Sequence, residues 1–390
     1  MQQSLTNTDL MQMADQCVKC AICLPACPTF TVYATETDSP RGRISLLQGL
    51  LNGDIDNEDA SLQTHISRCI GCGYCEKACP SSVNFSALMD NCKAEFKLHS
   101  RSLATLDAMV NHSAALLNSA KIIPGFIKSL LPDSLRQALD LSVSSQSKSY
   151  PDIKSKSHRG EIILFTGCIG KTVDHNAIHA ARFVLKLLGF SVNTGAQNCC
   201  GALYRHDGYA DKADQLATTN QKTFNQLKPD AILYLASGCG AELLKQSYDA
   251  PVIELCEFLL PLIDQIQPLL APIENESFQL HCPCSLYTQT DAWPAQSKFL
   301  SALFPDSFQE LNGNQKCCGA GGLHRLNHPE TANTLLKPKL QALADSGSQT
   351  LLTSNTGCAM HFTAGIHNAN LAVRVMHPIE LIADQMVAKM

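Results

Sequence analysis

The sequence predicts an α+β protein, in which a small helical N-terminal domain rich in cysteine precedes a duplicated α/β unit built on parallel sheets. Nearly half of the 19 cysteines fall within residues 1–100, where apolar segments are short. From residue 161 onward, strand-length apolar segments alternate with helical ones, the order that gives a parallel sheet with crossover helices. The cysteine positions recur in this second part, so we expect two similar units in succession.

Composition and charge are those of an ordinary globular protein. The 390 residues allow two or three domains, and 45% of them are apolar while 17% are charged. A net charge of -5 gives no reason to expect a nucleic-acid partner. The N-terminus lacks the features of a signal peptide, and the most apolar run, residues 253–263, is too short to span a bilayer. We therefore expect a cytoplasmic protein, or one bound peripherally to the inner face of the membrane.

The cysteine content is the unusual feature. An odd number of cysteines in a large chain without an export signal argues against a disulfide framework. Clustered thiols in a reducing compartment indicate metal or redox chemistry instead. Cys92 and Cys256 are exceptions, because each has helically spaced apolar neighbours and is expected to fill a core.

Two runs in the N-terminal domain carry the strongest chemical signal. CVKCAICLPACP and CIGCGYCEKACP both follow C-x2-C-x2-C-x3-C-P, the bacterial ferredoxin pattern for cubane 4Fe-4S clusters. In that pattern the fourth cysteine of each run binds the cluster of the other run. Structural zinc also accepts four thiolates, but it normally uses two C-x2-C pairs and leaves the third cysteine of each run unexplained. We predict one cluster on Cys17, Cys20, Cys23 and Cys79, and a second on Cys69, Cys72, Cys75 and Cys27.

Between the runs, the sequence predicts a helix with Ser39 as its N-cap, Pro40 in its first position and Gly53 at its end. Arg41 and Arg43 fall in its first turn, where the helix dipole disfavours cations. We expect them to pair with nearby acidic side chains. The alternatives are a carboxylate of a partner or the negative charge of the clusters.

Residues 101–160 are expected to connect the two parts of the chain. A helical pattern covers residues 103–131 with a break at Pro124, and a linker rich in Ser and Lys covers residues 142–160. We expect the helical segment to pack the two parts together. The alternative is an amphipathic contact with a membrane or a partner.

The duplicated part is expected to consist of repeats over residues 161–260 and 277–390. Each supplies a cysteine at the end of a strand, a Cys-Cys-Gly on a loop and a cysteine at the end of a later strand. Loops at the carboxyl ends of parallel strands converge, and glycine after the pair would let the backbone pass close to a bulky inorganic centre. The candidate ligands are Cys168, Cys199, Cys200 and Cys239 in the first repeat, and Cys284, Cys317, Cys318 and Cys358 in the second.

This spacing resembles the CCG domain of heterodisulfide reductase-type proteins, which binds iron-sulfur clusters with up to five cysteines. Where the resemblance implies the fifth cysteine, the two repeats have Glu242 and His361. Each site can therefore hold a cubane cluster, a variant cluster or none. His361 is an additional candidate ligand, and Cys282 can replace or supplement Cys284.

Over essentially its whole length the chain resembles the iron-sulfur subunits of glycolate oxidase, through both cysteine runs, DSPRGRI, HCPC, the CCG loops and SNTGC. The resemblance implies an electron-transfer subunit whose FAD-containing partner oxidises glycolate to glyoxylate, with a quinone or another membrane acceptor. It implies no catalytic residue in this chain, and the sequence has no NAD, ATP or flavin motif. The alternatives are a D-lactate or glycerol-3-phosphate dehydrogenase subunit, a heterodisulfide-reductase-like thiol/disulfide subunit, or a zinc scaffold.

Overall fold

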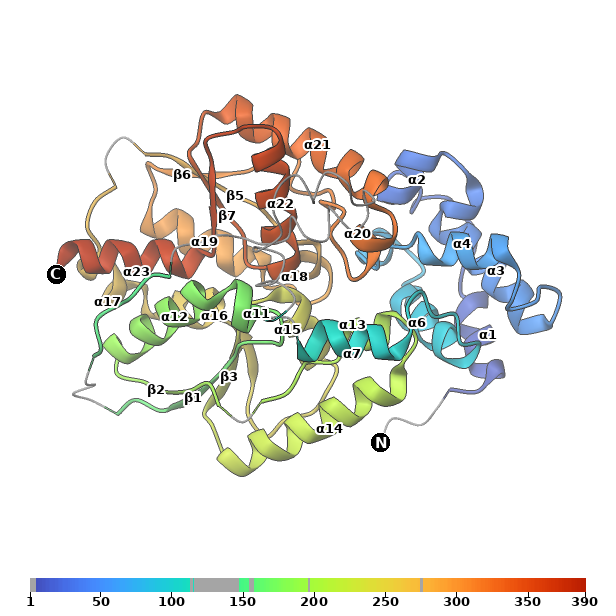
Figure 1. Ribbon diagram of the computed structural model, residues 1–390, viewed down its shortest axis with the longest axis horizontal. Helices are drawn as coiled ribbons and strands as arrows, with labels where there is room; N and C mark the ends of the chain where they lie inside the picture. The colour runs from blue at the N-terminus through green and yellow to red at the C-terminus, as the bar shows by residue number, and fades with distance from the viewer. Residues whose placement is uncertain (1–4, 113–114, 116–146, 154–157, 196, 274–275) are drawn as a thin grey trace.

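The computed structural model describes residues 5–112, 115, 147–153, 158–195, 197–273 and 276–390. Figure 1 shows the N-terminal helices at one end of the molecule and two α/β layers, one above the other, at the other end. Most of the predicted helical connector, with Pro124, and parts of the predicted linker lie outside the described residues. No described helix is long and apolar enough to cross a membrane.

Short helices build the N-terminal part. Leu10, Leu47 and Leu88, which are almost fully buried, bring α1, α3 and α6 together around one small core. Cys92 is fully buried in the same core, which confirms that it packs as a small apolar side chain. The helices are α1 (Asn7–Asp15), α2 (Pro28–Tyr33), α3 (Pro40–Asn52), α4 (Ala60–Ser67), α5 (Tyr74–Lys77) and α6 (Phe85–Glu95), with a 3-10 turn, η1 (Glu36–Asp38).

The helix predicted between the cysteine runs is α3. The hydroxyl of Ser39 accepts a hydrogen bond from the N–H of Gly42 at 3.0 Å, and Gly53 ends the helix with φ 80°. Both caps were predicted from the sequence, and both are confirmed. Arg41 pairs with Glu36 at 2.6 Å, as expected for a cation at a helix N-terminus that needs a local acidic partner.

Within the predicted helical segment of the connector, the structure describes α7 (Leu103–Asn111). Its buried residues Leu106 and Val110 pack into a core of the first repeat. Asp107 accepts a hydrogen bond from the hydroxyl of Tyr204 at 2.7 Å. This part of the connector therefore packs against the first repeat, in line with the expected role of the segment.

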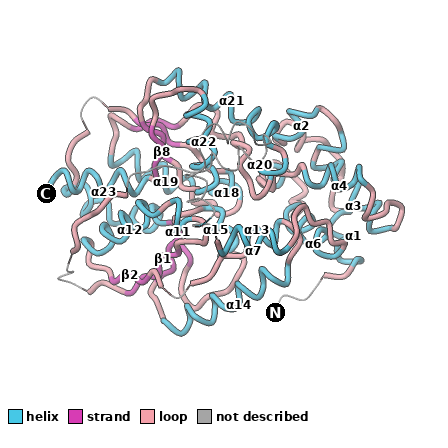
Figure 2. Tube along the Cα trace, in the orientation of Figure 1, coloured by secondary structure: helices cyan, strands magenta, loops and turns pink. Residues whose placement is uncertain are grey.

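The strands in the rest of the described chain form two four-stranded parallel sheets, which confirm the duplication. Figure 2 shows some of these strands. The strand orders of the two sheets are β2-β1-β3-β4 and β6-β5-β7-β8. The registers agree as well, because Leu164 pairs with Leu233 in the first sheet and Leu280 with Leu352 in the second. The strands are β1 (Glu161–Phe165), β2 (Ser191–Asn193), β3 (Ala231–Tyr234), β4 (Val252–Glu254), β5 (Phe278–Leu280), β6 (Phe308–Glu310), β7 (Thr350–Leu352) and β8 (Arg374–Met376).

Helices connect the strands within each sheet. In the first repeat and the segment after it they are α11 (Gly170–Val173), α12 (His175–Leu187), α13 (Ala202–His206), α14 (Ala210–Leu227), α15 (Ser237–Leu243), α16 (Leu255–Leu259) and α17 (Ile263–Ile266), with 3-10 turns η2 (Leu260–Leu262) and η3 (Gln267–Leu269). In the second they are α18 (Cys284–Thr288), α19 (Trp293–Leu303), α20 (His324–Asn327), α21 (Pro329–Ser346), α22 (Thr356–Asn368) and α23 (Pro378–Lys389).

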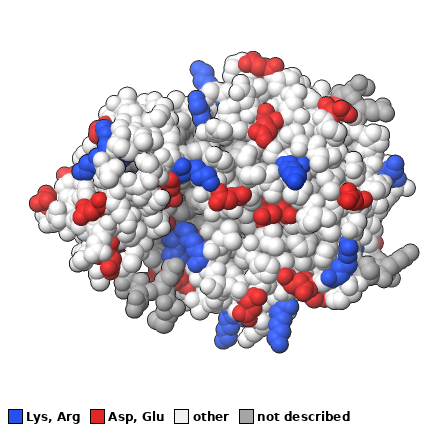
Figure 3. Space-filling model, turned by 180° about the vertical axis from the view of Figure 1, so that it is seen from behind, with Lys and Arg blue, Asp and Glu red and all other residues white. Residues whose placement is uncertain are grey.

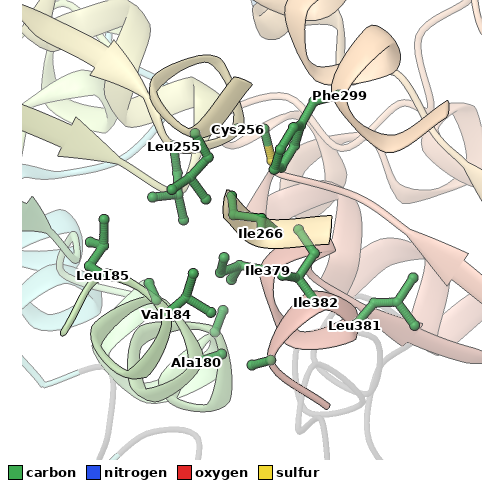
Figure 4. Packing of buried hydrophobic residues seen from close by; sticks show 14 of the residues in the cluster. Ala180, Val184, Leu185, Leu255, Cys256, Ile266, Phe299, Ile379, Leu381 and Ile382 are labelled. Atoms are coloured by element: carbon green, nitrogen blue, oxygen red, sulfur yellow. The ribbon is translucent and has the colours of Figure 1, made fainter. Parts of the chain in front are cut away.

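The two repeats share one apolar core. Figure 4 shows Val184 of α12 facing Ile379 and Ile382 of α23, with Phe299 of α19 close by. Cys256 belongs to this core and is fully buried, so it is also a core residue, as predicted. On the outside, the face shown in Figure 3 carries interspersed acidic and basic side chains.

Glu254 at the end of β4 makes the stability of this core dependent on pH. Its carboxylate accepts hydrogen bonds from the N–H of Glu257 and the amide of Gln296, but burial raises its pKa from 4.5 to about 7. The folded protein therefore keeps a proton that the unfolded chain releases, so the contribution of Glu254 to the free energy of unfolding falls as the pH rises from 4.5 to about 7. Glu254→Gln is expected to reduce this fall, measured as the thermal midpoint across that window, and Asp264→Asn is an exposed control. An unchanged pH profile in Glu254→Gln would contradict this assignment.

Candidate iron-sulfur sites

A cavity of about 460 Å³ lies between the N-terminal helices and both repeats. Its lining includes Cys27 from the first run together with Cys69, Cys72 and Cys75 from the second. These are the four cysteines that the ferredoxin pattern assigns to one cluster. Four sulfurs from two separate runs around one cavity fit a cluster that needs four thiolate ligands.

A buried charge network brings Cys27 to the second run. The carboxylate of Asp38 is fully buried and contacts Arg43 at 3.3 Å, His65 at 3.1 Å and Arg68 at 3.0 Å. Arg43 also donates to the hydroxyl of Thr29 at 3.0 Å and to the carbonyl of His65 at 2.8 Å. The network thus ties the residues after the first run to those before the second. It also confirms that Arg43 pairs with a nearby acidic side chain.

Asp38→Asn is expected to destabilise the protein by about 3 kcal/mol, because it leaves buried Arg43 without its charge partner. Burial opposes the charged form of Asp38, but hydrogen bonds from His65 and Thr35 and the charge of Arg43 together lower its pKa. The measurement is the midpoint of anaerobic thermal unfolding. Glu36→Gln is the matched control, because the pair of Glu36 with Arg41 is largely exposed and contributes less than about 1 kcal/mol. Equal midpoints for the two variants would refute the role given to Asp38.

The other predicted set of ferredoxin-type ligands lies nearer the surface. Burial raises the pKa of Cys23, and the charges of Cys17 and Cys27 act in the same direction. Cys17 and Cys79 pack against the same N-terminal core, whereas Cys20 is exposed. A hydrogen bond of 3.0 Å from Arg41 to the carbonyl of Lys19 holds the loop of the first run.

The structure brings together the four cysteines predicted for the first CCG site. The sulfurs of Cys168 and Cys199 are 3.3 Å apart, and this hydrogen bond raises the pKa of Cys168. The side chain of Cys200 lies within hydrogen-bonding reach of Cys199 and Cys239. Gly167 has φ 69°, and a Cβ atom added there would lie 3.2 Å from the sulfur of Cys239.

The second CCG site also gathers its four predicted cysteines. The sulfurs of Cys318 and Cys358 are 3.3 Å apart, and those of Cys317 and Cys284 are 4.0 Å apart. Hydrogen bonding with Cys284 lowers the pKa of Cys317 well below its usual value. The thiols of Cys318 and of Cys72, from the ferredoxin-type part, act in the same direction. Thiols packed this closely in a buried site suit a soft metal centre.

The cysteines that were expected to end strands lie elsewhere. None of the four cysteines expected at strand ends lies there, because β1, β3, β5 and β7 all stop earlier. Cys239 and Cys358 lie in the first turns of α15 and α22, and Cys284 begins α18. At α22 the side chain of Asn355 caps the N–H groups of Gly357 and Cys358, so a helix begins before the cysteine.

The glycine after each cysteine pair has a different role from the one expected. Gly201 and Gly319 have φ 94° and 90°, and a Cβ atom on either would meet the backbone of a helix, at 3.1 Å from Cα of Ala213 or 2.8 Å from Cα of Ala332. These glycines therefore allow a left-handed turn and close packing on α14 and α21. Close approach to an inorganic centre is not what demands them.

The residues at the missing fifth-cysteine positions have partners of their own. Glu242 forms ion pairs with Arg205 and, at 3.1 Å, with Lys245. His361 is buried, and its Nε2 lies 3.2 Å from the carbonyl oxygen of Ala332, so that nitrogen is already hydrogen-bonded. Neither side chain needs a metal to satisfy these atoms.

Cys282 lies beside the second CCG cysteines but has a different environment. It is buried, and its sulfur lies 3.7 Å from the carbonyl oxygen of Pro283. Burial raises its pKa, and the charges that act on it come from Lys339 and Glu310. Cys284, by contrast, lies beside Cys317, so the geometry favours Cys284 as the member of the cysteine group.

The ferredoxin-type part docks directly onto the second CCG site. Cys72 packs in one apolar cluster with Cys284 and Cys317. The hydroxyl of Thr288 donates to the carbonyl of Cys72 at 2.9 Å. A Cβ atom on Gly321 would lie only 2.5 Å from the carbonyl oxygen of Ile70, so the docked loop fits because that position is glycine.

Sequence reasoning missed two buried polar residues at the second CCG site. Lys339 is 3% exposed and donates to the carbonyl of Gly313 at 2.9 Å, and its charge acts on the cysteines of the site. The equivalent position of α14 holds Asn220, which donates to the carbonyl of Cys199 at 3.1 Å. The available signal was a lysine on the apolar face of α21. The second missed residue is His281, which burial keeps neutral by lowering its pKa.

Comparisons with known proteins agree with this arrangement. The 4Fe-4S dicluster domain family matches residues 16–84, and the cysteine-rich domain family matches residues 162–244 and 278–363. The chain joins a dicluster domain to two cysteine-rich domains. The dicluster domain holds both ferredoxin runs, and each cysteine-rich domain holds one CCG site. Iron-sulfur clusters are thus the cofactors of this chain, and they accept and release single electrons.

Several relatives match nearly the whole chain. The glycolate oxidase iron-sulfur subunit of Escherichia coli K12 is 27% identical, over 98% of this chain and 96% of the relative. The probable glycolate oxidase iron-sulfur subunit of Bacillus subtilis 168 is 27% identical, over 94% and 93%. One of the subunits of the dihydromethanophenazine:CoB--CoM heterodisulfide reductase of Methanosarcina mazei is 22% identical, over 98% and 96%. The chain is therefore an iron-sulfur electron-transfer subunit of the oxidoreductase type.

Proposed function

We propose that this chain is the iron-sulfur subunit of a flavin-dependent 2-hydroxy-acid dehydrogenase that oxidises glycolate to glyoxylate. Its partner would be an FAD-containing subunit, and its acceptor a quinone or another membrane acceptor. The observation that carries the proposal is the match of the whole chain to two glycolate oxidase iron-sulfur subunits. Substrate oxidation removes two electrons and belongs to the flavin, whereas this chain handles them singly.

We assign the cluster ligands from the cysteine spacing and from the residues that line the cavity. One cluster of the dicluster domain is held by Cys27, Cys69, Cys72 and Cys75, which line one cavity. The other is held by Cys17, Cys20, Cys23 and Cys79. Each CCG site holds a further iron centre on its four cysteines, Cys168, Cys199, Cys200 and Cys239 or Cys284, Cys317, Cys318 and Cys358.

The contact between domains supports a direct exchange of electrons between the dicluster domain and the second CCG site. Cys72 lies in the lining of the cluster cavity and also packs against Cys284 and Cys317. No described segment has to move for these two sites to be neighbours. The second CCG site is therefore the expected neighbour in the electron pathway.

Capture of the tagged chain from its own cells under anaerobic conditions tests the function. The expected result is co-purification of an FAD protein and reduction of a quinone analogue with glycolate. A doubly substituted chain, Cys27→Ser with Cys69→Ser, is expected to stop quinone reduction while glycolate still bleaches the flavin. Turnover with D-lactate or glycerol-3-phosphate and none with glycolate would transfer the assignment to those dehydrogenases.

A thiol/disulfide function is the second candidate, because the match to the heterodisulfide reductase subunit covers as much of the chain. The residues at the first CCG site argue against a thiol/disulfide function. Glu242 stands where the motif has its fifth cysteine, and it forms ion pairs with Arg205 and Lys245. Disulfide reduction by the purified chain with a chemical electron donor would favour this candidate. Absence of that activity, together with glycolate-dependent turnover of the complex, would favour the first.

A further inference from the structure

His281 follows β5 and lies at the second CCG site without an assigned role. Its side chain is 1% exposed, and neither ring nitrogen meets a partner at full hydrogen-bond geometry among the described residues, although Cys318 and Asn314 lie within reach of the ring. A ring nitrogen of His281 and the sulfurs of Cys318 and Cys358 all lie within 4.8 Å of one another. Buried polar groups nearly always form good hydrogen bonds, so an imidazole that forms none beside two thiols needs an explanation.

The first repeat provides an internal comparison. Phe165 stands before Cys168 at the same spacing as His281 before Cys284, and both residues directly follow equivalent leucines in the central strand of their sheet. The pocket in the fold thus accepts an apolar ring, and only the second repeat places a nitrogen donor there. Phe362 packs edge-on against His281, with ring centroids 4.8 Å apart, which holds the imidazole ring in position.

The other histidine near this site is less suited to bind a metal. His361 stands where the CCG motif has its fifth cysteine, but its Nε2 lies 3.2 Å from the carbonyl oxygen of Ala332. The ring nitrogen that lies within 4.8 Å of the sulfurs of Cys318 and Cys358 belongs to His281.

We propose that His281 is a nitrogen ligand of the iron centre at the second CCG site, in place of the fifth thiolate that the motif lacks here. This inference rests on the proposed presence of iron at the CCG sites. Imidazole replaces thiolate as an iron ligand in some iron-sulfur proteins, where it raises the reduction potential. The two CCG sites then differ in their donor sets, with sulfur alone in the first and sulfur with nitrogen in the second.

Pulsed EPR on the reduced full chain, with histidine labelled by nitrogen-15, tests this ligand. A Cys200→Ser background is used so that the first CCG site does not contribute. The expected result is a strong nitrogen coupling from directly bound histidine, which disappears in His281→Cys while second-site iron remains. His281→Phe, which copies Phe165 and leaves the four cysteines in place, is expected to keep that iron and to lose the coupling. His361→Gln is the matched control and is expected to keep both the iron and the coupling.

The outcomes separate this inference from the proposed function. If the full chain holds no more iron than the two dicluster-domain clusters need, the CCG sites bind none. The proposed iron centres at the CCG sites and the role of His281 would then both fall. Iron at the second site without histidine coupling, or with only the weak coupling of a hydrogen-bonded nitrogen, would overturn the role of His281 alone. A coupling that persists in His281→Cys and disappears in His361→Gln would also overturn it.

Discussion

Serine in place of Cys27 is expected to remove one cluster of the dicluster domain, and serine at Cys69 in the same chain should remove nothing more. Both thiols line one cavity although they come from different runs. A cluster that has lost one of four thiolates is lost or severely weakened, so a second ligand change at the same site has little left to affect. Iron analysis of the purified variants should show about half of the dicluster-domain iron lost in each case.

The contrasting double variant makes the test specific. Cys27→Ser with Cys20→Ser is expected to remove both clusters, because Cys20 belongs to the other predicted ligand set. If that pair loses no more iron than Cys27→Ser alone, the runs do not exchange their fourth cysteines. Cys92→Ser is the control for a cysteine change in this domain, since Cys92 is fully buried in the core and should not alter the iron content.

The sequence predicted these ligand groups because a tight loop with a fixed cysteine spacing is itself a ligand set. The same reasoning predicted the groups at the CCG sites, where two offset repeats pointed to four cysteines each and the structure brings the sulfurs of each group close together. Sheet topology followed for a similar reason, because the alternation of strands and helices restricts the order of a parallel sheet. In each case the signal lies in residues close in sequence, or in a period.

Contacts between distant segments could not be predicted in this way. The glycines of the CCG loops were expected to approach a metal centre, but the backbone of a helix occupies the space beside Gly201 and Gly319. Lys339 stands on the apolar face of α21, but no local pattern shows that this face meets the second CCG site, and the same is true of His281 after β5. The position of Cys72 against Cys317 depends on how two domains dock, which no local spacing reports.

The loop after the second cysteine pair contains an insertion that this docking explains. The first repeat reads CCGALYR and the second CCGAGGLHR, so Gly321 and Gly322 are the additional residues. A Cβ atom on Gly321 would lie 2.5 Å from the carbonyl oxygen of Ile70, whereas one on Gly322 would meet nothing within 4 Å. The carbonyl oxygen belongs to the backbone and cannot move aside alone. Gly321 is therefore required by the contact between the dicluster domain and the second CCG site.

Gly321→Ala is accordingly expected to loosen this contact and to destabilise the protein by about 1–3 kcal/mol through overpacking. Hydrogen exchange should increase in the loop of Ile70 and in α18, where Thr288 and Gln289 hydrogen-bond to that loop. Gly322→Asn is the matched control, because asparagine tolerates the left-handed conformation at φ 49° and makes no clash. Equal exchange in both variants would show that the insertion serves some purpose other than docking. Faster exchange in Gly321→Ala alone would make the domain contact, and with it the proximity of Cys72 to Cys317, a property of the protein in solution.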